Sequence, residues 1–239
     1  MIVAAVVCPA APVLVSEVAG EAAAELDGCR AACDAALDSL LARGLERVVV
    51  VGAGTIGRVH QAGAVGSLRP VGVDLSVALG ERATTADGES PLLPLSLTVG
   101  AWLLARHAWP GSVSGLEIPA DAAPDACRQA GRTLDQRPGR TGALVVADGS
   151  ARRGPAAPGY TDPRAHALDR SWVAALVDAR PDDLAALDPD LCADLLMSGR
   201  APLQVLAGAA GSRAWDGDLG YADDPYGVQY AVASWRLAD

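Results

Sequence analysis

Hydrophobic and polar positions along this chain follow two different periods. Runs of about four to eight residues that are apolar throughout are typical of strands covered on both faces, whereas apolar positions three and four apart are typical of helices. The first pattern predicts strands at residues 2–8, 47–51, 71–79, 113–118 and 141–147, and an alternating segment at 227–237 predicts a closing strand. The second pattern predicts helices at 18–43, 95–109, 121–134, 163–178, 181–197 and 201–210.

These strands and helices alternate along the whole chain. Such alternation is typical of an α/β protein in which helices cover both faces of a mostly parallel sheet. The first strand, the helix after it and the second strand should form a right-handed parallel unit. With 239 residues, 51% of them hydrophobic, the chain is long enough for a well-buried core. The sequence therefore predicts one three-layer α/β/α domain over residues 1–239, with a mixed, mostly parallel central sheet.

The composition narrows the classes of function. The net charge is −10 and no block of five basic residues occurs, so the basic footprint of a nucleic-acid-binding protein is missing. All 19 basic residues are arginine, which excludes a Schiff-base lysine, a pyridoxal phosphate lysine and a lysine-bearing phosphate loop. The apolar start of the chain is too short to span a bilayer and follows no basic segment. We therefore expect a cytoplasmic protein without a membrane partner.

The cysteines and histidines do not suggest a metal site. The cysteines are odd in number and form no CxxC pair, which is typical of buried reduced thiols: Cys8, Cys29, Cys33, Cys127 and Cys192. No two histidines have the spacing of metal ligands: His60, His107 and His166. We expect structural roles for the histidines, and no bound metal.

A glycine motif offers one alternative function. Gly52-x-Gly54-x-x-Gly57 directly follows the second predicted strand, and such glycines can bring a backbone and a helix N-terminus close to a pyrophosphate. Asp74 would then be the acid that binds the ribose. However, the segment after the motif contains further glycines and is a poor helix, and the motif follows the second strand instead of the first. Coincidence is the favoured interpretation of this spacing.

The most informative stretch runs from residue 143 to residue 169. Its predicted strand ends in the sequence ADGSARR at 147–153, followed by a loop rich in proline and glycine and by a helix near Asp162-Pro163. In open α/β sheets, ligands bind at the carboxyl ends of the strands, so this is a natural place for a site. Yet the position between Ser150 and Arg152 is Ala151, which has no functional group. Asp148 and Asp169 could be paired acids, but a structural role is the favoured interpretation for both.

Three segments give the chain a resemblance to a known family. They are the first strand with the turn CPAAPVL at 8–14, the sequence ADGSAR at 147–152 with APGY at 157–160 and Leu168-Asp169, and GRAPLQVLAG at 199–208 with PYGVQY at 225–230. In this order they resemble the class III extradiol ring-cleavage dioxygenase superfamily, specifically the domain that carries its catalytic centre. The resemblance implies an α/β/α fold, self-association, and a non-haem Fe(II) held by two histidines and a glutamate. A third histidine would act as acid and base in catechol cleavage.

Residue by residue, the chain departs from this pattern. The first iron histidine corresponds to Ala10, the second falls at Gly52 to Gly54, and the acid/base histidine corresponds to Ala151. The position of the glutamate ligand is open. Alanine and glycine have no side-chain lone pair and cannot ligate Fe(II). We therefore expect no cofactor, although Fe(II) is the norm of the family.

The sequence thus predicts a degenerate, non-catalytic and metal-free homologue of these dioxygenases. It would keep a pocket at the strand ends for an unidentified small molecule or protein partner, and self-association is left open. By analogy, we expect this pocket and its covering loop to include Cys8, Asp148, Ser150, Arg152 and Tyr160.

Two alternatives remain. One is an enzyme, dioxygenase-like or of other chemistry, that runs a different reaction from the same cleft with Cys8, Asp148, Ser150 or His60. The other is a dinucleotide-binding protein that uses Gly52, Gly54 and Gly57.

Overall fold

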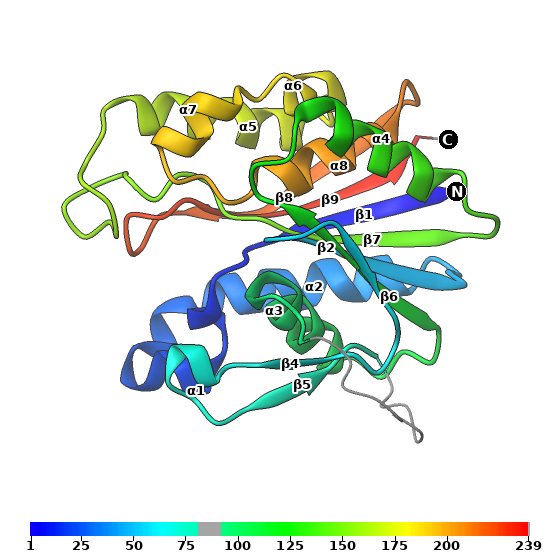
Figure 1. Ribbon diagram of the computed structural model, residues 1–239, viewed down its shortest axis with the longest axis horizontal. Helices are drawn as coiled ribbons and strands as arrows, with labels where there is room; N and C mark the ends of the chain where they lie inside the picture. Colours follow the sequence, from blue (N-terminus) through cyan, green and yellow to red (C-terminus); the bar gives the residue numbers. More distant parts are fainter. Residues whose placement is uncertain (81–91, 239) are drawn as a thin grey trace.

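A seven-stranded sheet forms the centre of the molecule, with the strand order β3-β6-β2-β7-β1-β9-β8 (Figure 1). The structure is a computed structural model that describes residues 1–80 and 92–238. Four central strands run parallel: β1 (Ile2–Cys8), β2 (Arg47–Gly54), β6 (Ser112–Pro119) and β7 (Thr141–Val146). Three outer strands pair antiparallel: β3 (Arg58–His60), β8 (Trp215–Asp223) and β9 (Tyr230–Leu237). A separate two-stranded sheet joins β4 (Val65–Ser67) to β5 (Ser76–Ala78).

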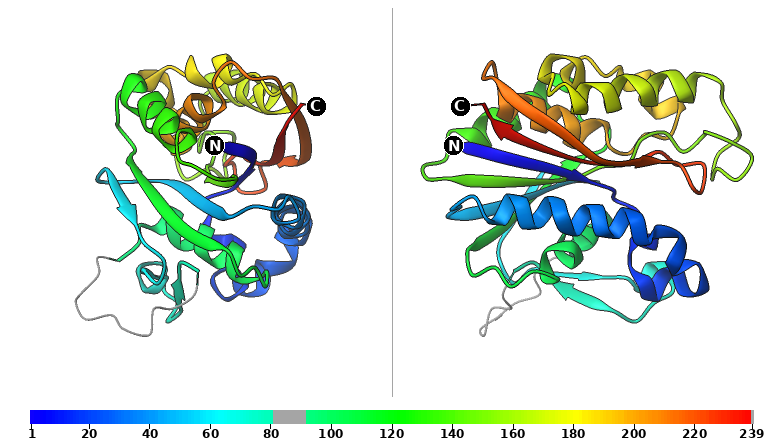
Figure 2. Two further views of the ribbon diagram at one scale, coloured as in Figure 1. Left: turned by 90° about the vertical axis from the view of Figure 1, so that its right-hand side faces the viewer. Right: turned by 180° about the vertical axis from the view of Figure 1, so that it is seen from behind.

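Helices cover both faces of the large sheet (Figures 1 and 2). One face carries α2 (Asp27–Leu41) and α3 (Leu95–Ala105), with α1 (Ser16–Ala19) and the small sheet beyond them. The opposite face carries α4 (Pro124–Asp135), α5 (Arg164–Val177), α6 (Pro181–Ala185), α7 (Pro189–Asp194) and α8 (Arg200–Ala210). Short 3-10 helices are η1 (Pro12–Leu14), η2 (Gly20–Leu26) and η3 (Arg69–Val71). The predicted three-layer α/β/α fold with a mixed, mostly parallel sheet is confirmed.

The continuous apolar runs are explained by burial on both faces of the sheet. In β7, Ala143 and Val145 enter the core cluster under α8, whereas Leu144 and Val146 enter the cluster on the side of α2 and α3. Because successive side chains of a strand point to opposite faces, each face needs its own apolar set. The same division holds in β1 and β2. The sheet is thereby fixed between two cores, and its strand ends are held in register.

Several details differ from the sequence prediction. Residues 71–79 do not form a strand of the large sheet, because η3 contains Pro70 and Gly72 takes a positive φ of 90°. Only Ser76–Ala78 is a strand, and it pairs with β4. The predicted helix at 18–43 begins with α1 and η2, and the one at 181–197 divides into α6 and α7 before Pro189. β8 and β3 were not predicted, and β7 lies between β1 and β2.

Candidate functional site

The parallel strands end at one edge of the sheet, where the sequence places its candidate residues. Cys8 of β1 lies opposite Val146 of β7, and Val146 lies opposite Gly52 of β2. The segments that leave these three adjacent strands therefore begin side by side. Each of the following residues on these segments is partly exposed: Ala10, Gly54, Asp148 and Ala151.

Asp148 is the polar centre of this edge. Its Oδ1 accepts a hydrogen bond from the backbone N–H of Ala10 at 2.8 Å, so it joins the end of β7 to the turn after β1. The residue is partly exposed, and the surrounding protein partly buries its carboxyl group. This burial raises the pKa of Asp148 from 3.8 to about 7, against a smaller lowering effect of the Ala10 N–H. Among residues 1–80 and 92–238, no arginine or histidine contributes to this pKa or forms an ion pair with Asp148.

Ser150 belongs to a buried network and does not line an open pocket. Its backbone N–H and its hydroxyl donate to the two carboxyl oxygens of Asp169 in α5, at 2.9 and 2.5 Å. The indole N–H of Trp172 also donates to Asp169, at 2.9 Å. Ser150 and Asp169 are both fully buried. The prediction that Ser150 lines the pocket is therefore wrong, because its hydroxyl already fastens the strand end to α5.

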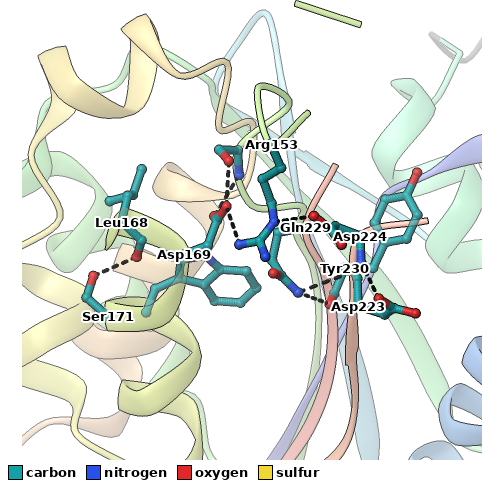
Figure 3. A network of polar contacts seen from close by, with 10 residues as sticks. Arg153, Leu168, Asp169, Ser171, Asp223, Asp224, Gln229 and Tyr230 are labelled. Carbon is teal, nitrogen blue, oxygen red and sulfur yellow. Dashed lines mark hydrogen bonds and ion pairs between the residues drawn. The ribbon is translucent and has the colours of Figure 1, made fainter. Parts of the chain in front are cut away.

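Arg153 extends this network to the β8–β9 turn (Figure 3). Its guanidinium donates to Asp169 at 3.3 Å and to Asp224 at 2.6 Å. The side-chain amide of the buried Gln229 donates to the backbone carbonyls of Asp223 and Tyr230. The loop after β7 is thus anchored to both α5 and the closing hairpin.

Gly54 lies against a buried carboxyl group that the sequence analysis did not single out. Glu117 of β6 pairs with His60 Nε2 at 2.9 Å, and its other oxygen accepts the backbone N–H groups of Thr55 and Ile56. A Cβ on Gly54 would lie 2.6 Å from Glu117 Cδ. The carboxyl group therefore occupies the space that a side chain at position 54 would need. An acidic residue inside an apolar strand was the available signal, because buried charges require partners.

We expect Gly54→Ala to lower the free energy of unfolding by about 1–3 kcal/mol, because a methyl group would overpack this site. Urea denaturation at pH 7 measures the effect. Gly57→Ala in the same turn is a matched control, since a Cβ there would meet only Pro119 Cδ at an ordinary 3.9 Å. Equal stability of the Gly54→Ala and Gly57→Ala proteins would contradict the packing described for Glu117.

The residues at this edge do not fit the Fe(II) centre that the family resemblance implies. The side chains of Ala10 and Ala151 supply no lone pair, and the side-chain space at Gly54 is filled by Glu117. Both oxygens of Glu117 already have partners. Among residues 1–80 and 92–238, no three His, Cys, Asp or Glu side chains are grouped so as to hold a metal ion. An iron site of two histidines and one carboxylate therefore cannot be assembled here from the described side chains.

The glycine motif lacks the context of a dinucleotide site. β2 continues to Gly54, and Gly57 leads into β3, so no helix N-terminus follows the motif. Asp74 pairs with Arg69 at 2.7 Å on the surface. The strand-to-helix turn that the dinucleotide alternative requires is therefore not formed, because the chain pairs with the sheet edge there instead of turning into a helix.

Of the remaining pocket candidates, two line one hollow and one does not. Arg152 and Tyr160 are both part of the wall of a hollow of about 620 Å³ on the loop after β7. Cys8 is fully buried in the core on the side of α2, together with Cys29 and Cys33. The prediction for Cys8 is therefore wrong, because its side chain packs into the core below the strand end.

The two histidines away from this edge have separate positions. His107 Nδ1 pairs with Asp38 at 2.9 Å and joins the end of α3 to α2. His166 lies in α5 and is partly exposed.

Comparison with known proteins supports the fold. The sequence matches no protein-family model and no curated protein. Among solved structures, the uncharacterized protein JW3007 from Escherichia coli K12 is similar, with a TM-score of 0.56 and 12% identity over 98% of this chain and 99% of that one. At this identity, the likeness extends to the fold alone. Within the described residues, no helix has the length and apolar character to cross a membrane.

Proposed function

We propose that this chain is a metal-independent binding domain that takes a small molecule at the carboxyl edge of its sheet. In this proposal, the resemblance to the class III extradiol dioxygenases is one of fold, and iron chemistry is absent. The observation that carries the proposal is Asp148, a partly buried carboxyl group at the strand ends that no cation of the described residues neutralises.

Burial of a charged Asp148 carboxylate costs free energy of folding. Its one hydrogen bond, from the backbone N–H of Ala10, does not require a charge. Burial disfavours a carboxylate relative to its protonated form. An asparagine at this position could accept the same N–H of Ala10 without a charge. Functional groups kept at the expense of stability are typical of binding and catalytic sites. Ala10 and Ala151 add small apolar surface to the same edge. These features favour a ligand with an apolar body and a group that hydrogen-bonds to a carboxyl.

The absence of iron chemistry is tested by loading the purified protein anaerobically with Fe(II), removing unbound metal and measuring the iron content. We expect far less than one iron per chain, because the edge lacks the ligand set of such a centre. Assays with catechols should show no ring cleavage. Stoichiometric iron together with catechol turnover would overturn the proposal.

Binding at the edge is tested by ligand-observed NMR with a library of small fragments. At least one fragment that binds the wild type should lose binding to Asp148→Asn and keep it with Asp218→Asn, an exposed aspartate of β8. If every fragment binds the Asp148→Asn protein unchanged, the edge is not the binding site.

A second candidate function is an enzyme that uses Asp148 as a general acid or base. A pKa of about 7 suits this role, because both protonation states are then available near neutral pH. A screen with hydrolase and isomerase substrates would test it. The rate should titrate near pH 7, and Asp148→Asn should abolish it. A rate that survives in Asp148→Asn would exclude this role.

A further inference from the structure

The loop between β7 and α5 contains an arginine, Arg152, whose side chain has no partner among residues 1–80 and 92–238. The Arg152 side chain forms no ion pair or hydrogen bond within the described part of the chain, and its Nε is buried and unbonded. A guanidinium carries a permanent charge and five donors, so burial of an unsatisfied N–H is costly. Arg152 therefore has the unmet hydrogen-bonding capacity expected of a ligand contact.

Neighbouring acidic groups do not supply the missing acceptor. Asp162 accepts the side chain of Arg164 at 2.8 Å and its backbone N–H at 2.9 Å. These contacts lower the pKa of Asp162 to about 2, and Arg152 makes only a minor contribution. Asp169 and Asp224 are both bound by Arg153. These three carboxylates are thus bound by Arg164 and Arg153, and none is left for Arg152.

Arg152 lies in the wall of the hollow of about 620 Å³, which is within the size range of small-molecule sites. Pro155, Pro158 and Tyr160 supply apolar surface to the same wall. The Tyr160 residue is 90% exposed, so its ring is available for stacking. At Gly159 a Cβ would lie 3.0 Å from Arg152 Cγ, so the glycine allows the loop to close over the arginine.

We infer that this hollow binds a small organic oxyanion, a carboxylate or a phosphate monoester, through the Arg152 guanidinium. The planar guanidinium donates two parallel N–H bonds to such a group, and the ring-sized body of the ligand packs against Tyr160 and the prolines. The inference goes beyond the proposed function, because Asp148 is not part of the wall of this hollow. The two proposals can therefore fail separately.

The test uses calorimetric titration of the full chain with benzoate and phenyl phosphate, and with benzyl alcohol as the uncharged counterpart. We expect the anions to bind and the alcohol not to bind. Arg152→Ala should weaken anion binding by about tenfold to a hundredfold, the value of a hydrogen-bonded charge. Arg152→Lys should recover part of the affinity, because it keeps the charge but not the two parallel donors. The tighter anion distinguishes a carboxylate ligand from a phosphate ligand.

Arg170→Ala is the matched control, because Arg170 is an exposed arginine on the nearby α5. It should leave anion binding unchanged. The NMR signal of Arg152 Nε–H, identified by its loss in Arg152→Gln, should shift when the anion binds. Anion binding that Arg152→Ala and Arg170→Ala weaken equally would mean only nonspecific charge attraction and would overturn the inference. Failure of both anions to bind would also overturn it, whereas iron loading with ring cleavage would instead overturn the proposed function.

Discussion

Replacing Asp148 with asparagine is expected to stabilise the protein at pH 8 by about 2–4 kcal/mol and to change its stability little at pH 4. The pKa of this carboxyl rises from 3.8 to about 7 on folding because the group is buried. Between pH 3.8 and about pH 7, the Asp148 carboxyl keeps its proton in the folded state and releases it in the unfolded state. Stability therefore falls as the pH rises through this window, and above it the full penalty is present. Since each pH unit corresponds to about 1.4 kcal/mol, about 4 kcal/mol is the upper bound.

The measurement is urea denaturation of the wild type and Asp148→Asn from pH 4 to pH 8. The difference between the two proteins cancels the titration of the other acidic groups. Asparagine can still accept the N–H of Ala10, so only the charge is removed. Asp218→Asn, at an exposed position on β8, should show a nearly constant difference from the wild type. A constant difference for Asp148→Asn as well would mean that its carboxyl is not buried as described.

The central strands were predictable because burial on both faces requires apolar residues at successive positions of a strand. β1, β2 and β7 are apolar at nearly every position, so the run itself identifies each strand. β8 has no such apolar run, because it is an edge strand with exposed aspartates and glycines. Residues 71–79 contain an apolar alternation, but Pro70 and the positive φ of Gly72 override it. The pairing of β1 with β7 could not be predicted either, because it joins residues that are far apart in sequence.

The candidate site was predictable only in part. The position of Asp148 follows from the end of a strand, and the missing side chains at Ala10 and Ala151 can be read directly. The roles of Ser150 and Glu117 could not be read, because their partners lie 19 and 57 residues away in sequence. The loop rich in proline and glycine was predictable from the sequence. The absence of a partner for Arg152 among the described residues was not, because it depends on which arginines bind the nearby carboxylates. Such assignments depend on tertiary geometry and not on residue type.

Asp169→Ala is expected to lower the free energy of unfolding by about 3–5 kcal/mol, the cost typical of breaking a buried charged network. The carboxylate accepts from the N–H and hydroxyl of Ser150, from Trp172 and from Arg153, and it is fully buried. Its loss leaves these donors without an acceptor and removes side-chain volume from the contact with Gly149. Because the strand end and its loop are fastened to α5 through this group, the variant should also loosen the loop that carries Arg152.

Urea denaturation at pH 7 measures the loss, and hydrogen exchange of the Ser150 amide reports the loosening. Asp224→Ala is the matched control, because Asp224 also binds Arg153 but its side chain is 32% exposed. Ion pairs that keep contact with solvent contribute less than fully buried ones, so this variant should lose about 1 kcal/mol. Asp169→Asn should lie between the two, since its amide keeps one acceptor oxygen but turns a donor toward Ser150 or Arg153. A loss for Asp169→Ala no greater than that for Asp224→Ala would show that Asp169 does not hold the strand end to α5.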